Sequence, residues 1–249
     1  VGSEMCIRDR GYKVYFDPST RFMRGLDSEG NWRTPFNPRA SNHRNDDYCE
    51  GTAWQWTWFV PHDVDGLVEL MGGRDAFIGK LDSLFTADSK LEGESTSVDI
   101  SGLIGQYAHG NEPSHHIAHL YNYVGQPWRT QEIVDEVLHT LYFNNPDGLS
   151  GNEDCGQMSA WYILNAMGFY QVCPGKPVYS IGRPLFNEAT VHLKDGKSFK
   201  VIAHNNSRDN KYVRSIVLNG NKLETPFFTH QDIVDGGTLE LTMGSEPLK

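Results

Sequence analysis

TQEIVDEVLHTLYFNNP, residues 130–146, is the stretch that best fixes the fold class. Its apolar residues recur at helical spacing, namely Ile133, Val134, Val137, Leu138 and Leu141. Such a stripe covers one face of a helix and predicts that this face packs in a core. Thr130 can cap the start of this helix, and the turn residues at 144–146 predict its end.

Further helices are predicted on both sides of this stretch. Their apolar stripes occupy residues 53–71 with a break at Pro61, 75–85, 113–124, where Pro113 suits the first turn, and 156–167. Little strand-like sequence separates these helices, whereas parallel βαβ units need apolar strands between them. We therefore expect a mainly α protein with a small β part, in which the helices form part of an (α/α)6 toroid.

The periodicity changes after Pro174. Alternating or β-branched segments occur at 178–181, 189–193, 198–203, 213–218 and 238–243. Asp195-Gly196 and Asn219-Gly220 stand where two-residue hairpin turns belong. These features predict a helical domain over residues 11–172 and a C-terminal antiparallel β-unit over residues 173–249.

Residues 1–10, VGSEMCIRDR, carry no period and no helix cap. They resemble translated sequencing-adapter sequence, so we expect them to be foreign to the protein and leave them out of fold reasoning. A short native linker is the alternative.

Composition excludes some classes of partner. The net charge is −10 and the isoelectric point is near 5.4, which argues against nucleic acid, and no apolar run is long enough for a membrane span. Several aromatic residues stand beside polar ones, as in Trp54-Gln55-Trp56. That pattern suits a site for neutral polyhydroxylated ligands, although core packing explains any single aromatic residue.

Residues 48–56 form the first of three polar segments. Glu50 stands just before a predicted helix and among aromatic residues, a position that suits a general acid. A carboxylate that stabilises the helix N-terminus is the alternative.

The second polar segment spans residues 105–116. Asn111 and Glu112 offer the hard oxygen ligands that Ca²⁺ prefers. His115 and His119, four residues apart, could instead bind zinc, although His116 stands where a zinc peptidase motif has glutamate. A hydrogen-bonded, packed helix face would explain these histidines equally.

The third polar segment spans residues 146–158. A glycine-rich turn delivers Asn152, Glu153 and Asp154 to the start of a predicted helix, and turn chemistry alone could explain them. Inverting glycoside hydrolysis would require Asp154 to face Glu50 across a sugar, with the carboxyl groups about 6.5–9.5 Å apart.

Three longer motifs extend these segments: EGTAWQWTWFVPHDVDGL at 50–67, IGQYAHGNEPSHHIAHLYNYVGQPWRTQ at 104–131 and PDGLSGNEDCGQMSAWYILNAMGFYQVCPG at 146–175. In this order they closely resemble the α-mannosidases of glycoside hydrolase family 92, over roughly residues 12–249. The resemblance implies an N-terminal β-sandwich followed by an (α/α)6 barrel, with calcium in the cleft between them. It further implies that residues 11–172 form the C-terminal part of the barrel and that the sandwich is missing from this chain.

The resemblance also implies an exo-acting, inverting and Ca²⁺-dependent α-mannosidase acting on N-glycans or mannan outside the cytoplasm, in the periplasm, at the cell surface or secreted. Glu50 would be the general acid and Asp154 the general base. Asn152 occupies a position where family members often have a second aspartate. Asn111 and Glu112 would lie near calcium.

Contacts to the sugars follow from the same resemblance. They would come from Arg24, Trp54, His109, Gly110 and His115, and the HGNEP form at 109–113 is similar to the branch that cleaves α-1,2 linkages. A zinc hydrolase using His115 and His119, and a non-catalytic carbohydrate-binding fragment, are the competing hypotheses. We also expect the 249-residue chain alone to be inactive and poorly stable.

Overall fold

The structure is a computed structural model that describes residues 7–43 and 45–249. Its contacts divide the chain into two compact units. The first contains residues up to 115 together with 150–152, and the second contains 116–149 and 153–249. The expectation for residues 1–10 falls mostly outside the described residues.

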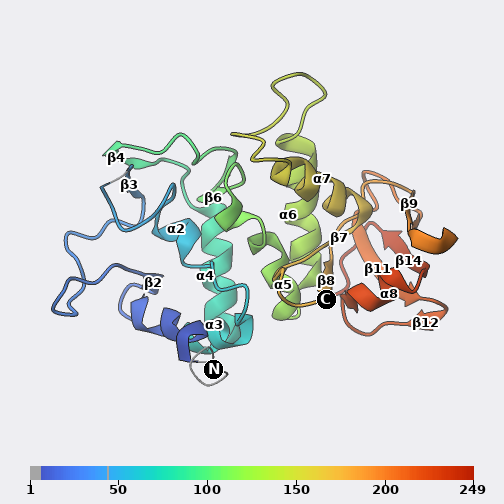
Figure 1. The fold of residues 1–249 in the computed structure, drawn as a ribbon, viewed down its shortest axis with the longest axis horizontal. Helices are drawn as coiled ribbons and strands as arrows, with labels where there is room; N and C mark the ends of the chain where they lie inside the picture. Colours follow the sequence, from blue (N-terminus) through green and yellow to red (C-terminus); the bar gives the residue numbers. More distant parts are fainter. Residues whose placement is uncertain (1–6, 44) are drawn as a thin grey trace. The chain divides into compact units, whose positions relative to one another are not determined.

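In the part of the first unit that the structure describes, residues 7–9 are helical and further helices and several short strands follow (Figure 1). The further helices are α2 (Ala53–Trp56), α3 (Val64–Leu70) and α4 (Arg74–Thr86), with 3-10 turns at Gly11–Tyr15 and Glu112–Ser114. The strands pair as β1 (Phe16–Asp17) with β2 (Phe22–Met23), β3 (Ala40–Asn42) with β4 (Glu92–Ser95), and β5 (Leu103–Ile104) with β6 (Tyr107–Ala108).

Helix α4 supplies much of the core of the first unit. Phe77, Leu81 and Leu84 follow helical spacing and are fully buried. The indole ring of Trp58 meets the ring of Phe77 edge to face, with centroids 5.3 Å apart. Burial of these side chains fixes α3 and α4 and gives the loops around α2 a rigid support.

The second unit combines helices with two sheets. Its helices are α5 (Leu120–Tyr123), α6 (Pro127–Thr140), α7 (Gln157–Met167) and α8 (His230–Val234), with 3-10 turns at Ile117–His119 and Lys194–Gly196. The strands are β7 (Phe169–Tyr170), β8 (Val178–Ile181), β9 (Glu188–His192), β10 (Ser198–His204), β11 (Tyr212–Leu218), β12 (Asn221–Lys222), β13 (Phe227–Thr229) and β14 (Gly237–Gly244). The sheet orders are β12-β11-β14-β10-β9 and β13-β8-β7.

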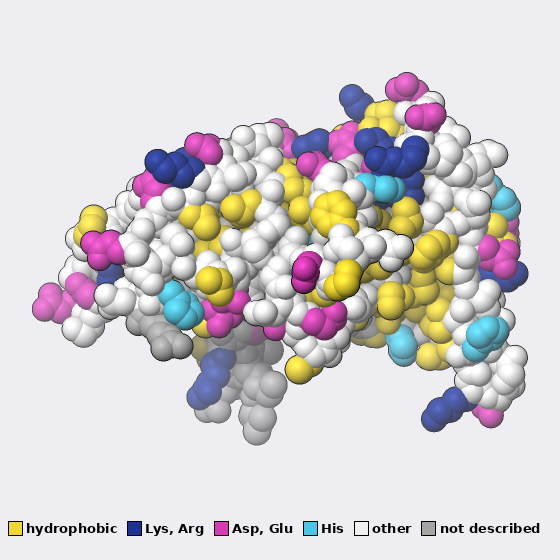
Figure 2. Space-filling model, turned by 90° about the horizontal axis from the view of Figure 1, so that it is seen from above, with side chains coloured by type: hydrophobic (Ala, Val, Ile, Leu, Met, Phe, Trp, Pro, Cys, Tyr) yellow, Lys and Arg dark blue, Asp and Glu magenta, His cyan; other side chains and the backbone are white. Residues whose placement is uncertain are grey.

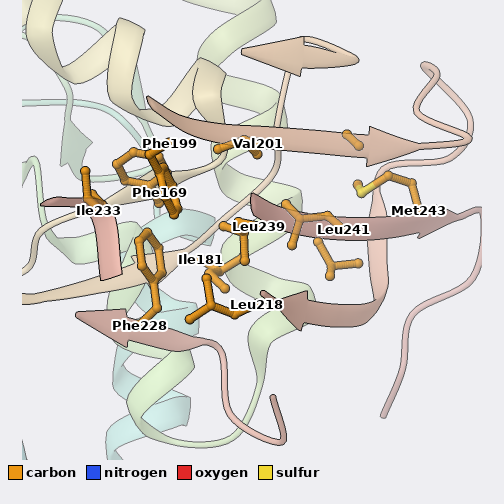
Figure 3. Packing of buried hydrophobic residues seen from close by; sticks show 12 residues of the cluster. Phe169, Ile181, Phe199, Val201, Leu218, Phe228, Ile233, Leu239, Leu241 and Met243 are labelled. Atoms are coloured by element: carbon orange, nitrogen blue, oxygen red, sulfur yellow. The ribbon is translucent and has the colours of Figure 1, made fainter. Parts of the chain in front are cut away.

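A cluster of buried apolar side chains holds the two sheets of the second unit together (Figure 3). Phe199 from β10, Phe228 from β13 and Leu239 from β14 point into it. Leu164 and Met167 of α7 pack against the same cluster. Helices and strands therefore share one core, and the contact division does not follow the expected boundary near residue 173, although helices do give way to strands at β7.

The two-residue turn predicted at Asn219-Gly220 is confirmed, whereas the hairpin at Asp195-Gly196 forms through the longer 3-10 turn Lys194–Gly196. Asp195-Gly196 links β9 to β10 and Asn219-Gly220 links β11 to β12, and all four residues have positive φ. That backbone matches the right-handed twist of the flanking strands.

The prediction of a purely antiparallel β-unit is wrong, because β10 and β14 pair in parallel, with Phe199 opposite Gly237. The connection between them runs through β11, β12, β13 and α8, which is long enough for a parallel crossover.

The prediction of one continuous helix over 113–124 is also wrong. The segment forms two separate 3-10 turns and the single turn of α5. Buried histidine and asparagine side chains in this segment hydrogen-bond to groups outside it, which competes with a continuous helix. Thr130 is not a cap either: α6 begins at Pro127, and the Thr130 hydroxyl donates to the Ala118 carbonyl at 2.9 Å.

None of the helices in the described part of the chain has the length and apolar character of a membrane-spanning segment. Figure 2 shows acidic and basic side chains scattered over one face, with hydrophobic side chains exposed between them.

Candidate active site

Glu50 stands on a loop that is tied firmly to α2. Thr52 caps this helix, and the Gln55 side chain returns to the Thr52 backbone N–H at 2.6 Å in a capping box. The amide of Gln55 also donates to the Gln106 carbonyl at 2.5 Å. The Glu50 side chain is exposed, so a carboxylate on a fixed loop faces solvent.

Asn111 lies directly beside Glu50. Its Nδ2 donates to the Glu50 carbonyl oxygen at 2.9 Å, and its Oδ1 accepts from the Glu112 N–H at 3.1 Å. The Asn111 side chain is buried. The structure therefore brings the first and second polar segments together, as the predicted site requires.

The start of the third polar segment packs against the second. A Cβ atom on Gly110 would collide with the Ser101 hydroxyl and lie 3.0 Å from the Ser150 carbonyl oxygen, and one on Gly151 would lie 2.9 Å from the Gly110 carbonyl oxygen. Only glycine permits so close a backbone approach. Asn152 follows at once, with its Nδ2 3.5 Å from Asp99 Oδ1.

Asp154 belongs to the second compact unit, whereas Glu50, Asn111 and Asn152 belong to the first. Asp154 is exposed, at the turn that leads into α7. Its pairing with Glu50 across a sugar stays a prediction.

Both predicted catalytic carboxylates have left-handed backbone conformations. The φ angle is +51° at Glu50 and +50° at Asp154. Such angles are costly for residues other than glycine, and they concentrate at functional sites, where the surrounding structure enforces them. Arg21, Cys155 and Asn205 share the conformation, as do Asp195 and Asn219 in hairpin turns that require it.

Comparison with known proteins decides the family. Residues 4–245 match the model of the glycosyl hydrolase family 92 catalytic domain. The chain belongs to glycoside hydrolase family 92.

Solved structures of this family are close in sequence and fold. A family GH92 α-mannosidase from Bacteroides thetaiotaomicron in complex with mannoimidazole is 43% identical, with a TM-score of 0.88 over 95% of this chain and 32% of its own. A GH92 inverting mannosidase from the same organism is 40% identical, with a TM-score of 0.85 over 98% of this chain and 34% of its own.

An uncharacterized secreted glycosidase of Arthroderma benhamiae is 32% identical over 200 residues, which are 79% of this chain and 24% of that protein. The family 92 chain thus spans a quarter to a third of the length of these relatives.

The predicted sugar contacts of this family 92 chain lie in two places in the first unit. Trp54 meets Phe22 edge to face, with ring centroids 4.9 Å apart. Arg24 is buried, with Nη1 2.7 Å from Asp17 and Nη2 donating to the Arg33 carbonyl at 2.7 Å. The contacts of Arg24 therefore hold its own loop, and its contact with a sugar stays a prediction.

His109 and His115 form a second, buried pair. A ring nitrogen of His115 lies 2.9 Å from the His109 carbonyl oxygen, and Nδ1 of His109 lies 2.8 Å from the Tyr107 hydroxyl. Burial, with His115 nearby, holds the pKa of His109 well below its usual range, so this imidazole is neutral near pH 7. Their roles in binding sugar stay predictions.

The described residues do not have the arrangement of histidines that the zinc hypothesis requires. His115 lies between the 3-10 turns Glu112–Ser114 and Ile117–His119, so no regular helix joins it to His119. Both ring nitrogens of His119 have partners, Nδ1 with the Ser180 hydroxyl at 3.1 Å and Nε2 with Asn165 at 2.8 Å. The described residues contain no group of three or more His, Cys, Asp or Glu side chains that could hold a metal.

The side-chain oxygens of Asn111 and Glu112 are of the kind that Ca²⁺ prefers, but two residues supply too few ligands for it. Both residues offer oxygen ligands, whereas Ca²⁺ takes six to eight. Further oxygens from water, sugar hydroxyls or other parts of the protein would have to complete such a site.

Two features of the first unit were not predicted from the sequence. Lys80 on α4 is buried, with its Nζ 3.2 Å from the ring centroid of Phe22 and 4.5 Å from that of Trp54. Burial, with Arg21 nearby, lowers the pKa of Lys80 to about 7. A cavity of about 490 Å³ also opens beside Tyr48 and Cys49. Neither feature has a signal in the sequence, because each depends on contacts between distant segments.

Proposed function

We propose that the protein is an exo-acting α-mannosidase that removes terminal α-1,2-linked mannose from N-glycans or mannan with inversion and depends on Ca²⁺. One observation carries the proposal: in a family 92 chain, Asn111 hydrogen-bonds to the carbonyl of Glu50, so the predicted cation ligand and the predicted acid share one local structure. Relatives with 40–43% identity named as GH92 mannosidases support it.

The proposed chemistry divides the work between two carboxyl groups. Glu50 donates its proton to the glycosidic oxygen as the bond from that oxygen to the anomeric carbon breaks. Asp154 accepts a proton from the water whose oxygen bonds to the opposite face of that carbon. Asn152 cannot share a proton, but its amide can orient this water.

The remaining predicted residues would bind the sugars and the cation. Arg24, Trp54 and His115 would contact the mannose, and the His109-Gly110 pair would contact the leaving sugar. Asn111 and Glu112 would supply part of the calcium shell. When bound, the cation would supply electrostatic support to the sugar as it approaches the transition state.

We propose further that a β-sandwich domain and the first part of an (α/α)6 barrel complete the enzyme, and that it acts in the periplasm, at the cell surface or after secretion. The share of the relatives that the chain spans supports the first proposal. The relative named as a secreted glycosidase supports the second.

The test is mannose release from α-1,2-mannobiose by the longer protein that contains this chain, with NMR detection of the first anomer formed. We expect β-mannose, and a loss of turnover of about a hundredfold or more in Glu50→Gln and in Asp154→Asn. Glu29→Gln and Glu153→Gln are matched controls, because Glu29 is an exposed loop residue and Glu153 adjoins Asp154.

Unchanged rates in Glu50→Gln and Asp154→Asn would refute the assignment of the site, and α-mannose as first product would refute inversion. Mannobiose that binds without being cleaved would favour a non-catalytic carbohydrate-binding protein.

A further inference from the structure

The second unit contains a cavity of about 630 Å³ that none of the predicted catalytic residues lines. The residues that line it come from the loop after α6 and from α7. No charged side chain of the described residues lines it, although the Glu153 carboxylate accepts from the hydroxyl of the lining residue Ser159 at 2.9 Å. A cavity of this size can hold a small ligand, and its lining suits a neutral one.

One wall of the cavity is an aromatic surface held in place by its neighbours. The ring of Tyr142 is parallel to that of Trp161 at 6.0 Å and lies 4.8 Å from that of Tyr162. The Tyr142 hydroxyl donates to the Met158 carbonyl at 3.2 Å. An aromatic face fixed in this way offers a flat apolar surface at little cost in side-chain entropy.

The loop that borders the cavity, residues 143–149, is held by hydrogen bonds between its own backbone groups. The Phe143 N–H donates to the Gly148 carbonyl at 3.0 Å, and the Gly148 N–H donates to the Asn145 carbonyl at 3.1 Å. A Cβ atom at position 148 would collide with the Phe143 carbonyl oxygen, so the turn requires glycine. The loop is therefore formed before a ligand arrives.

This loop presents polar groups that are available for a ligand. Asn144 and Asn145 are exposed cavity-lining residues. Their side-chain amides and the Tyr162 hydroxyl make no hydrogen bond to the residues that the structure describes. Together they offer neutral donors and acceptors around an aromatic face, which is the complement of a sugar ring with its hydroxyl edge and its apolar C–H face.

We propose that this cavity is a binding site for a neutral oligosaccharide, with one sugar ring on Tyr162 and hydroxyls bound by Asn144 and Asn145. The site would hold a glycan chain without cleaving it. Neither Glu50 nor Asp154 lines the cavity, so this proposal does not depend on the proposed catalytic function.

The test is a binding titration of the full 249-residue chain with α-1,2-mannobiose, followed by saturation-transfer NMR, with glucuronic acid as a charged comparison. We expect mannobiose to bind and glucuronic acid not to bind. Tyr162→Ala and Asn145→Asp should weaken mannobiose binding at least tenfold, and the second variant keeps the size of the side chain. Phe186→Ala removes an exposed aromatic ring that does not line the cavity, and it should bind as the parent does.

Because Glu50 and Asp154 do not line the cavity, a failure of the proposed mannosidase activity would not change the effect of Tyr162→Ala and Asn145→Asp on binding. Unaltered binding in both Tyr162→Ala and Asn145→Asp, or no binding by the folded parent chain, would overturn the proposal. Self-association that Ile163→Asp abolishes, without any sugar binding, would overturn it in favour of a second copy of the chain on the exposed Phe143 and Ile163 side chains.

Discussion

The side-chain amide of Asn111 donates a hydrogen bond to the main-chain carbonyl of Glu50 at 2.9 Å, across 61 residues of sequence. Because the Asn111 side chain is buried, the bond anchors the Glu50 loop to the interior of the first unit. Removing it leaves the Glu50 carbonyl without this donor and frees the loop to move.

We therefore expect Asn111→Ala to lower the free energy of unfolding by about 1–2 kcal/mol and to lower the turnover of the longer enzyme more than its substrate affinity. Thermal unfolding and the kinetic constants measure the two effects. Asn45→Ala, at an exposed loop residue, is the control. A variant with full turnover would show that the bond does not position Glu50.

The left-handed backbone at Glu50 leads to a second prediction. Glycine adopts a φ of +51° without the steric cost that other residues incur, so Glu50→Gly should raise the stability of the chain by about 1 kcal/mol while abolishing activity. Asp195→Gly, at a hairpin turn with φ of +62°, should give the same gain without loss of activity. Equal loss of stability in both variants, measured by denaturant unfolding, would contradict this account.

The third prediction concerns Lys80 and the way in which the stability of the chain depends on pH. Its pKa is about 7 in the folded chain, below its ordinary value of 10.5, so the unfolded chain binds the extra proton between these values. Stability should therefore rise as the pH increases from 7 towards 10.5. Lys80→Met removes the buried ammonium and should flatten this rise, whereas Lys90→Met, at an exposed position, should not. Denaturant midpoints at pH 7 and pH 9.5 provide the measurement.

Local chemistry explains which elements could be predicted. Helices α4, α6 and α7 carry apolar residues at helical spacing, and the turn at Asn219-Gly220 needs only two residues of the right kind. The prediction of a helix at 113–124 is wrong because contacts with distant residues determine its conformation. Its periodicity is helical, but hydrogen bonds such as that of His119 to Asn165 come from distant residues.

In the candidate site, too, local sequence predicts the polar segments but not the contacts between them. Sequence identified the three polar segments, but spacing cannot show that Asn111 meets Glu50 or that Gly110 packs against Gly151, because long-range packing creates both contacts. Lys80 was missed because lysine on a helix is normally exposed, and only the tertiary structure places it against Phe22 and Trp54.

Metal removal is the fourth prediction. If Asn111 and Glu112 supply part of a calcium shell, a chelator should abolish mannose release by the longer enzyme, and Ca²⁺ should restore it. Glu112→Gln should raise the Ca²⁺ concentration needed for restoration, because it removes a negative charge from the ligand set. Calorimetric titration with Ca²⁺ measures this directly. Full activity after exhaustive chelation would contradict the calcium proposal.

His119 gives the last prediction, in the second unit. Burial lowers its pKa from 6.5 to about 4, so the folded chain holds the ring neutral while the unfolded chain takes up a proton between these values. The stability that His119 contributes is thus present above pH 6.5 and is lost as the pH falls towards 4. His119→Gln should weaken this pH dependence and, by disturbing the bonds to Ser180 and Asn165, cost about 1–3 kcal/mol at pH 7. His192→Gln, at an exposed position on β9, should change neither quantity, and unfolding curves at pH 4.5 and pH 7 compare the two variants.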